Sequence, residues 1–161
     1  MLSIRRATAD DVPTVLGFIH ELAEYEKLTP MVVATEAALR RDGFTPGSEP
    51  KFQVLIAEWS GKPVGHAFYF FNYSTFRGKP GLFLEDLYVQ PAMRGKGIGK
   101  ALLAALARIA VAEDCYGMKW DVLDWNTPAI DFYKSLGAEM LDDWVPVRLT
   151  GEPLERLAKS A

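Results

Sequence analysis

One stretch of the chain, Leu82 to Ala105, constrains the rest, because an apolar strand pattern there runs into a glycine-rich loop and then a helix pattern. Gly95, Gly97 and Gly99 stand at alternate positions in the loop, so no side chain there separates the backbone from a ligand. The following helix begins with N–H groups that lack intrahelical partners and with the positive end of its dipole. Three cationic residues stand in or beside the loop: Arg94, Lys96 and Lys100. The stretch therefore predicts a binding site for a phosphate or pyrophosphate.

Two common phosphate motifs do not fit this loop. A P-loop has four residues between its first glycine and the Gly-Lys-Ser/Thr that follows, whereas three separate Gly95 from Gly99, and Ala101 replaces the magnesium-binding hydroxyl. A dinucleotide fingerprint reads Gly-x-Gly-x-x-Gly with an acidic residue about 20 positions later. The loop reads Gly-x-Gly-x-Gly, and no suitable acidic residue follows in register. A glycine-rich surface turn with a solvated basic flank is the plain structural alternative.

Length and composition limit the class of protein. With 161 residues, 49% of them hydrophobic, the chain can build one well-packed core, so we expect a single domain over residues 1–161. No apolar run approaches the ~20 residues that span a bilayer, and the first residues lead directly into a strand pattern; we expect a cytoplasmic protein without a membrane partner. A net charge of −3 argues against a nucleic-acid partner. One cysteine, Cys115, and two histidines, His20 and His66, offer neither a metal-ligand cluster nor an internal disulfide.

Hydrophobic periodicity along the chain predicts a mixed α/β fold with one sheet flanked by helices. Thr8 to Asp11 has the pattern of a capping box, and the helix that it opens ends near Tyr25. Ser60 to Pro63 is typical of a hairpin turn. The expected strands cover residues 3–6, 52–59, 64–73, 82–89, 119–123 and 140–149, and the other expected helices cover 35–42, the segment from the glycine loop to about 114, 126–136 and 154–158.

A second group of candidate functional residues lies in the helix pattern from Trp125 to Ala138. Pro128 suits the first turn of this helix, where its missing N–H costs nothing. Asn126 and Tyr133 are seven residues apart, which is two helical turns, so their side chains can share one face. Taken alone, a tyrosine in an amphipathic helix is more often a core residue than a catalytic one.

The glycine loop, Arg94-Gly95-Lys96-Gly97-Ile98-Gly99, resembles the Arg/Gln-x-x-Gly-x-Gly/Ala signature of the GNAT superfamily of N-acetyltransferases. Asn126 to Ala138 resembles that family's Asn-x-x-Ala-x-x-Phe-Tyr-x-x-x-Gly-Phe/Ala segment. The resemblance implies a mostly antiparallel central sheet and acetyl-CoA as the acetyl donor, with the loop cradling its pyrophosphate. It also implies that Asn126 touches the pantetheine arm and that the Tyr133 hydroxyl lies near the thioester sulfur.

Three further segments resemble the diamine branch of the family, which contains the spermidine/spermine and thialysine N-acetyltransferases: Glu21–Glu26, Leu84–Val89 and Phe132–Lys134. Together the resemblances assign these residues to acetyl-CoA: Leu87, Val89, Arg94, Gly95, Lys96, Gly97, Ile98, Gly99, Lys100, Asn126 and Tyr133. They assign Glu26, Glu85 and Asp86 to the amine.

The chemistry of amine acetylation gives some of these residues roles. An acceptor amine has a pKa near ~10.4, arrives as ammonium, and must lose a proton before it attacks a carbonyl. We assign Glu85 as the base, directly or through a water, and Asp86 as an orienting or substrate-charge group. Strand alternation sends these two side chains to opposite faces, unless a β-bulge lies here. A backbone N–H near Leu87 to Val89 would stabilise the oxyanion, and Tyr133 would protonate the departing thiolate. Amine and thioester can then react without a covalent enzyme intermediate.

The identity of the amine stays open at the level of sequence. Polyamine-acetylating relatives tend to have an acidic residue and a tryptophan where this chain has Ser74 and Phe76, which disfavours a long polyamine. Short diamines, lysine-like amino acids such as thialysine and other small amines stay open as acceptors, and Arg77 or Lys79 is a candidate partner for an amino acid carboxylate. A protein or peptide N-acetyltransferase and a non-catalytic acyl-CoA-binding module are the alternatives. The resemblance also implies a homodimer with the last strands at its interface.

Overall fold

The computed structural model describes residues 1–160. The chain forms two compact units, Met1–Asp121 and Val122–Ala161, and each is described by itself. The expectation of a single domain over residues 1–161 stays a prediction. Within the described residues, no helix combines the length and the apolar character needed to cross a membrane.

The first unit is built on a five-stranded sheet in which the strands lie in the order β1-β2-β3-β4-β5. Neighbouring strands are antiparallel except for β4 and β5, which are parallel. This arrangement confirms the expected α/β class with a mostly antiparallel sheet. The strands are β1 (Leu2–Arg6), β2 (Gln53–Trp59), β3 (Lys62–Ser74), β4 (Lys79–Val89) and β5 (Met118–Lys119).

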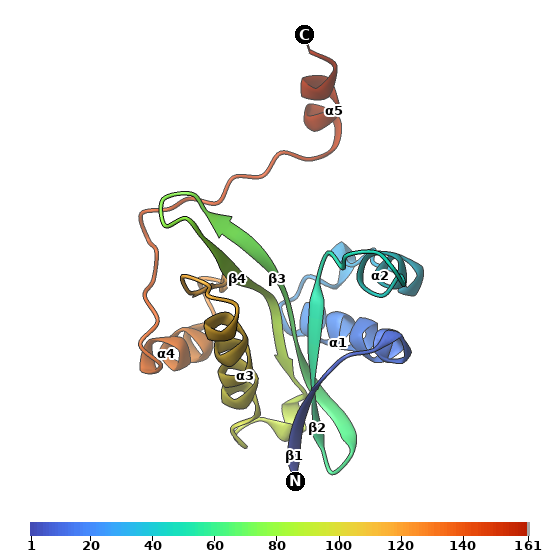
Figure 1. Cartoon of the computed structure of the whole chain (residues 1–161), viewed down its shortest axis with the longest axis vertical. Coiled ribbons are helices and arrows are strands. Elements are labelled where there is room, and N and C mark those ends of the chain that lie inside the picture. Colours follow the sequence, from blue (N-terminus) through green and yellow to red (C-terminus); the bar gives the residue numbers. More distant parts are fainter. Residues whose placement is uncertain (161) are drawn as a thin grey trace. The chain divides into compact units, whose positions relative to one another are not determined.

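Helices cover both faces of this sheet. Figure 1 shows α3 on one side of the strands and α1 and α2 on the other. The helices of the first unit are α1 (Val12–Tyr25), α2 (Glu36–Gly43) and α3 (Ile98–Ala112), with short 3-10 helices η1 (Ala9–Asp11), η2 (Thr29–Met31) and η3 (Pro91–Met93). The second unit contains α4 (Thr127–Ser135) and α5 (Gly151–Lys159).

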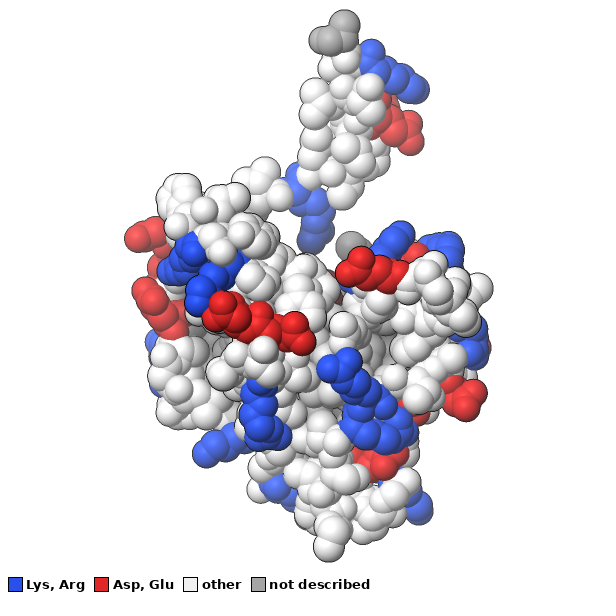
Figure 2. Space-filling view, in the orientation of Figure 1, with Lys and Arg blue, Asp and Glu red and all other residues white. Residues whose placement is uncertain are grey.

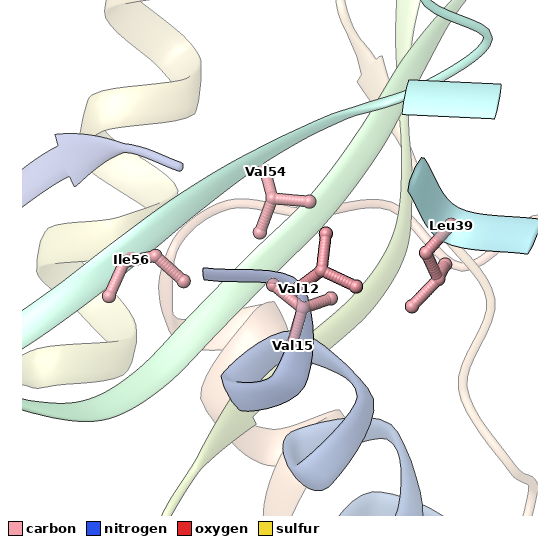
Figure 3. Close-up of a cluster of buried hydrophobic side chains, with 5 residues drawn as sticks. All are labelled: Val12, Val15, Leu39, Val54 and Ile56. Carbon is pink, nitrogen blue, oxygen red and sulfur yellow. The ribbon is translucent and has the colours of Figure 1, made fainter. Parts of the chain in front are cut away.

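The α1 face of the sheet is closed by a cluster of buried aliphatic side chains (Figure 3). The hydrophobic stripe of α1 supplies Val12 and Val15, β2 supplies Val54 and Ile56, and α2 supplies Leu39. Burying each such side chain stabilises the fold by about 1.5–3 kcal/mol. The cluster therefore fixes α1 and α2 against the strands that lead to the candidate site.

The capping box predicted at Thr8 to Asp11 is present, and it is also an ion-pair centre. The Asp11 carboxylate accepts a hydrogen bond from the Thr8 N–H at 2.8 Å. Arg5 of β1 donates to both Asp11 oxygens, at 2.8 and 2.9 Å, and to Glu58 of β2 at 2.8 Å. The hydrogen bond from Arg5 is the main reason why the pKa of Asp11 is lowered. The start of α1 is thus tied to two strands.

The hairpin between β2 and β3 differs in detail from the prediction. Strand β3 already begins at Lys62, so the turn consists of Ser60 and Gly61 and not of Ser60 to Pro63. Both turn residues have positive φ, 51° at Ser60 and 79° at Gly61. Two-residue turns with this backbone conformation match the right-handed twist of the strands that they join.

Two strand predictions were wrong in extent or in kind. Strand β5 covers Met118–Lys119 and not residues 119–123; it pairs only with Leu82 and Phe83 of β4, just before an irregularity that interrupts that strand. Among the described residues, 140–149 form no strand, although Val145 and Val147 keep an alternating pattern and are exposed. The alternating pattern indicates extended backbone, but a strand also needs a second strand to which its backbone can hydrogen-bond. Pro146 cannot donate such a bond, because it lacks an N–H.

His66 of β3 is a polar residue placed in the core. It is 0% exposed, neither ring nitrogen has a hydrogen-bond partner, and its ring packs edge-on against Phe18 of α1 at 5.4 Å between centroids. Burial disfavours the charged imidazolium and lowers the pKa of His66 from 6.5 to about 3. Below pH 6.5, His66 therefore binds a proton in the unfolded chain but stays neutral in the folded chain.

We predict that replacing His66 changes how stability depends on pH. As pH falls below about 6.5, the unfolding free energy of the wild type should drop relative to that of His66→Leu by up to about 1.4 kcal/mol per pH unit. Groups common to both proteins cancel in this difference. Urea unfolding between pH 5 and 7.5 measures it, with His20→Gln, which removes an exposed imidazole of α1, as the matched control. A constant difference across this range would contradict the prediction.

Candidate active site

The glycine loop joins β4 to α3 and is open to a ligand. Gly95 and Gly97 have φ values of 77° and 79°, a conformation that favours glycine. A Cβ added at either position would meet no heavy atom within 4 Å, so the space beside the loop is free. Ile98, only 1% exposed, anchors the start of α3, and Gly99 lies next to Val89.

The N-terminus of α3 suits an anion. Its N-cap is Gly97, which offers no side chain to accept hydrogen bonds from the first N–H groups, and its first turn has no acidic residue. The first backbone donors and the helix dipole are therefore not neutralised by the helix itself. Exposed Lys100 adds a positive charge in the first turn. This donor set fits the pyrophosphate of an acyl-CoA.

The two cations inside the loop are held by aromatic rings that the sequence analysis did not connect to it. The guanidinium carbon of Arg94 lies 4.7 Å from the ring centre of Tyr25, and the Lys96 Nζ lies 5.7 Å from the ring of Trp59. The Lys96 side chain thus extends toward β2, so its contribution to an anion site would come from its backbone. No local pattern predicts such contacts, because the rings belong to α1 and β2.

A β-bulge, which strand alternation alone does not predict, is present in β4. Phe68 of β3 faces Asp86, and the next residue, Tyr69, faces Leu84, so Glu85 is an extra residue without a partner. Directly opposed residues share a face of the sheet. Asp86 therefore lies on the α1 face with Phe68, which packs against the cluster of Figure 3. Glu85 is exposed, whereas Asp86 is half-buried.

Glu85, Asp86 and Glu26 form an acidic group in which the charges of Glu85 and Glu26 act on Asp86. Glu26 directly follows α1, and its N–H bonds to the Leu22 carbonyl at 2.9 Å. Burial, followed by the charges of Glu85 and Glu26, raises the pKa of Asp86 to about 6. Burial also raises the pKa of Glu26. A cation that enters this group would favour the ionised form of Asp86 and Glu26 and would therefore lower both pKa values.

Asn126 and Tyr133 belong to the second unit, and the structure places both on α4 as predicted. Asn126 is the N-cap residue of this helix and is 9% exposed, and its carbonyl accepts a hydrogen bond from the Ile130 N–H at 3.0 Å. Tyr133 is half-buried, and its ring centre lies 5.7 Å from that of Phe132. Their assignment to the site rests on the sequence resemblance.

The candidate partners for an amino acid carboxylate have other contacts. The Arg77 guanidinium carbon lies 4.7 Å from the ring centre of Tyr116, and the Lys79 Nζ pairs with Asp114 at 2.8 Å.

Acidic and basic side chains are interspersed on the face drawn in Figure 2. Among residues 1–160, no three His, Cys, Asp or Glu side chains are grouped so that they could hold a metal ion.

Comparison with known proteins places these features in a family. The profile of the acetyltransferase (GNAT) family matches residues 19–138. Thialysine N-epsilon-acetyltransferase of Bos taurus is 42% identical over 166 residues, which cover 96% of each chain. L-ornithine N5-acetyltransferase of Arabidopsis thaliana is 31% identical, over 97% of this chain and 87% of its own. Among solved structures, an integron cassette protein from the mobile metagenome of V. cholerae superimposes with a TM-score of 0.81 at 29% identity, covering 99% of this chain and 98% of its own.

The chain therefore belongs to the GNAT acetyltransferase family, and it is an N-acetyltransferase. The similarity to thialysine acetyltransferases extends over nearly the whole chain, which confirms the branch of the family indicated by the sequence. GNAT acetyltransferases use acetyl-CoA as the acetyl donor, and the open glycine loop of this chain fits that donor.

Proposed function

We propose that this enzyme transfers the acetyl group of acetyl-CoA to the terminal amine of a small lysine- or ornithine-like amino acid, with short diamines as weaker acceptors. The acidic group of Glu26, Glu85 and Asp86 carries the proposal, because Glu85 and Asp86 lie on the strand that feeds the glycine loop and the half-buried Glu26, at the end of α1, acts on Asp86. The thialysine and ornithine acetyltransferases to which the chain is similar are named for acceptors that carry such an amine.

In this proposal the donor is held by backbone groups. The N–H groups of the loop from Gly95 to Lys100 and the guanidinium of Arg94 bind the pyrophosphate. Leu87 and Val89 bind the acyl end through their backbone, and Asn126 binds the pantetheine arm. This mode of binding explains why the loop is rich in glycines, since a ligand bound by backbone N–H groups needs no side chain there.

The acceptor amine is bound as an ammonium ion by Asp86 and Glu26. Glu85, exposed at the bulge, removes its proton directly or through a water. The amine nitrogen then bonds to the acetyl carbon, and a backbone N–H near Leu87 to Val89 stabilises the oxyanion. The carbon–sulfur bond breaks as the nitrogen loses its second proton to solvent and becomes the neutral amide. Tyr133 protonates the leaving thiolate and regains its own proton from solvent. No acyl-enzyme forms, since holding amine and thioester together suffices for direct transfer.

A homodimer and a cytoplasmic location are further parts of the proposal. A second copy would give the exposed apolar residues of 140–149 a partner, which would suit the strand pattern of that segment.

Thiol release from acetyl-CoA tests the proposed function. The acceptors are thialysine, lysine, ornithine, putrescine, spermidine and a lysine-containing peptide, with no acceptor as the blank. We expect the free amino acids to exceed spermidine and the peptide by at least about tenfold in kcat/KM, because Ser74 and Phe76 replace the acidic residue and tryptophan typical of polyamine enzymes. A preference for the peptide would favour a protein acetyltransferase instead. Tight CoA binding without turnover on any acceptor would favour a binding module.

The role of Tyr133 predicts a specific defect. Tyr133→Phe should lower kcat by about 10²- to 10⁴-fold, while the Kd for acetyl-CoA changes little, because only the proton donor is lost. Steady-state kinetics and calorimetry measure the two quantities. Tyr73→Phe, at a tyrosine that is 64% exposed, is the matched control. Turnover close to that of the wild type across pH would remove Tyr133 from the mechanism.

The acidic group predicts how activity depends on pH. With the pKa of Asp86 raised to about 6, this carboxyl is neutral below pH 6 and attracts an ammonium ion only above it. We expect kcat/KM for the amine to rise through about pH 6, and Asp86→Asn should remove this limb and raise the KM for the amine. Glu85→Gln should instead lower kcat. If Asp86→Asn keeps the limb near pH 6, another group titrates there.

A further inference from the structure

Arg94 is anchored between two tyrosine rings that come from different elements of the first unit. Its guanidinium carbon lies 4.7 Å from the ring centre of Tyr25, the last residue of α1, and 5.8 Å from that of Tyr88 in β4. Its Nε donates a hydrogen bond to the Val89 carbonyl at 2.9 Å. These contacts fix both the position of the guanidinium and the direction of its plane.

The hydrogen bond at Nε leaves the terminal nitrogens of Arg94 for an anion. Within residues 1–160, no salt bridge and no further hydrogen bond of Arg94 is present. An arginine side chain otherwise samples many rotamers, and that freedom is lost when it binds a ligand. Rings that hold the cation in advance reduce this loss, because a cation over an aromatic face is attracted to it.

The second ring is itself held in place. Tyr88 is 4% exposed, and its ring lies 5.8 Å from that of Phe18. Burial and a hydrogen bond to Glu21 of α1 raise the pKa of Tyr88 to about 12, so the phenol stays protonated. Arg94 therefore lies against a fixed surface made by the C-terminal half of α1 and the end of β4.

From this geometry we propose that Tyr25 and Tyr88 are positioning residues, which hold the Arg94 guanidinium ready for the pyrophosphate of acetyl-CoA. The inference rests on the proposed function of the glycine loop. Neither tyrosine touches the donor in this scheme; both act through Arg94. Tyr25 also directly precedes Glu26, so α1 would contribute to both halves of the site, to the donor through Arg94 and to the amine through Glu26.

Tyr25 is the residue to test, because its side chain is 40% exposed and its replacement leaves the core intact. Tyr25→Leu removes the aromatic face, whereas Tyr25→Phe keeps it. We expect Tyr25→Leu to raise the Kd for CoA and the KM for acetyl-CoA by about three- to tenfold. Tyr25→Phe should stay within about twofold of the wild type. In both variants kcat and the KM for the amine should hold, since the reacting groups are untouched. Tyr73→Leu, at another exposed tyrosine, is the matched control.

Two further measurements separate positioning from a general structural effect. Pantetheine lacks the pyrophosphate, so Tyr25→Leu should not change its affinity. In an Arg94→Ala background, Tyr25→Leu should cause no further loss of CoA affinity, because the group through which it acts is gone. An equal loss for pantetheine, or an equal loss in the Arg94→Ala background, would overturn the inference.

The failures of the two proposals are distinguishable. If the wild type does not bind CoA in calorimetry, the proposed function fails, and this inference fails with it. If the wild type binds CoA and Tyr25→Leu binds it equally well, only the positioning role is overturned.

Discussion

The pairing of β3 with β4 is the constraint on which the candidate site depends. The ladder runs from Gly65 opposite Val89 to Ser74 opposite Lys79, with one shift in register. At one end it brings the chain to the glycine loop, where the Gln90 N–H bonds to the Val64 carbonyl at 2.9 Å. Near its middle the shift displaces Glu85 and turns Asp86 toward α1. Backbone hydrogen bonds therefore place the glycine loop, Glu85 and Asp86 along a single strand.

Side-chain contacts then determine the orientation of the glycine loop and the pKa values of the carboxylates. The cations of the loop lie against rings from α1, β2 and β4, so the orientation of the loop depends on elements that precede it in the chain. The carboxylates acquire their properties from burial and from one another, and the pKa of Asp86 rises for both reasons. Neither effect belongs to a motif; both arise only when the sheet and α1 have assembled.

Most of the fold and part of the site could be predicted from the sequence, because their signals are local. The capping box at Thr8 depends on residues close together in the chain, and this prediction was confirmed. The loop glycines are equally local in sequence, and the anion site predicted from them stays a prediction. The bulge could be stated only as a condition, since the alternating pattern of β4 does not reveal an extra residue. The contact of Arg94 with Tyr25 and the short pairing of β5 depend on tertiary packing. The residues of 140–149 have a strand pattern, but the sequence cannot show whether such a segment finds a partner.

The bulge at Glu85 also affects how such an enzyme can evolve. A residue inside a ladder is constrained by the residue opposite it, whereas Glu85 has no partner across the sheet. Its side chain can be exchanged while the register of β3 and β4, and with it the position of the glycine loop, is preserved. The loop glycines have no such freedom, because their positive φ restricts replacement. Within one scaffold, position 85 can therefore vary without disturbing the sheet, while the loop is held by its backbone.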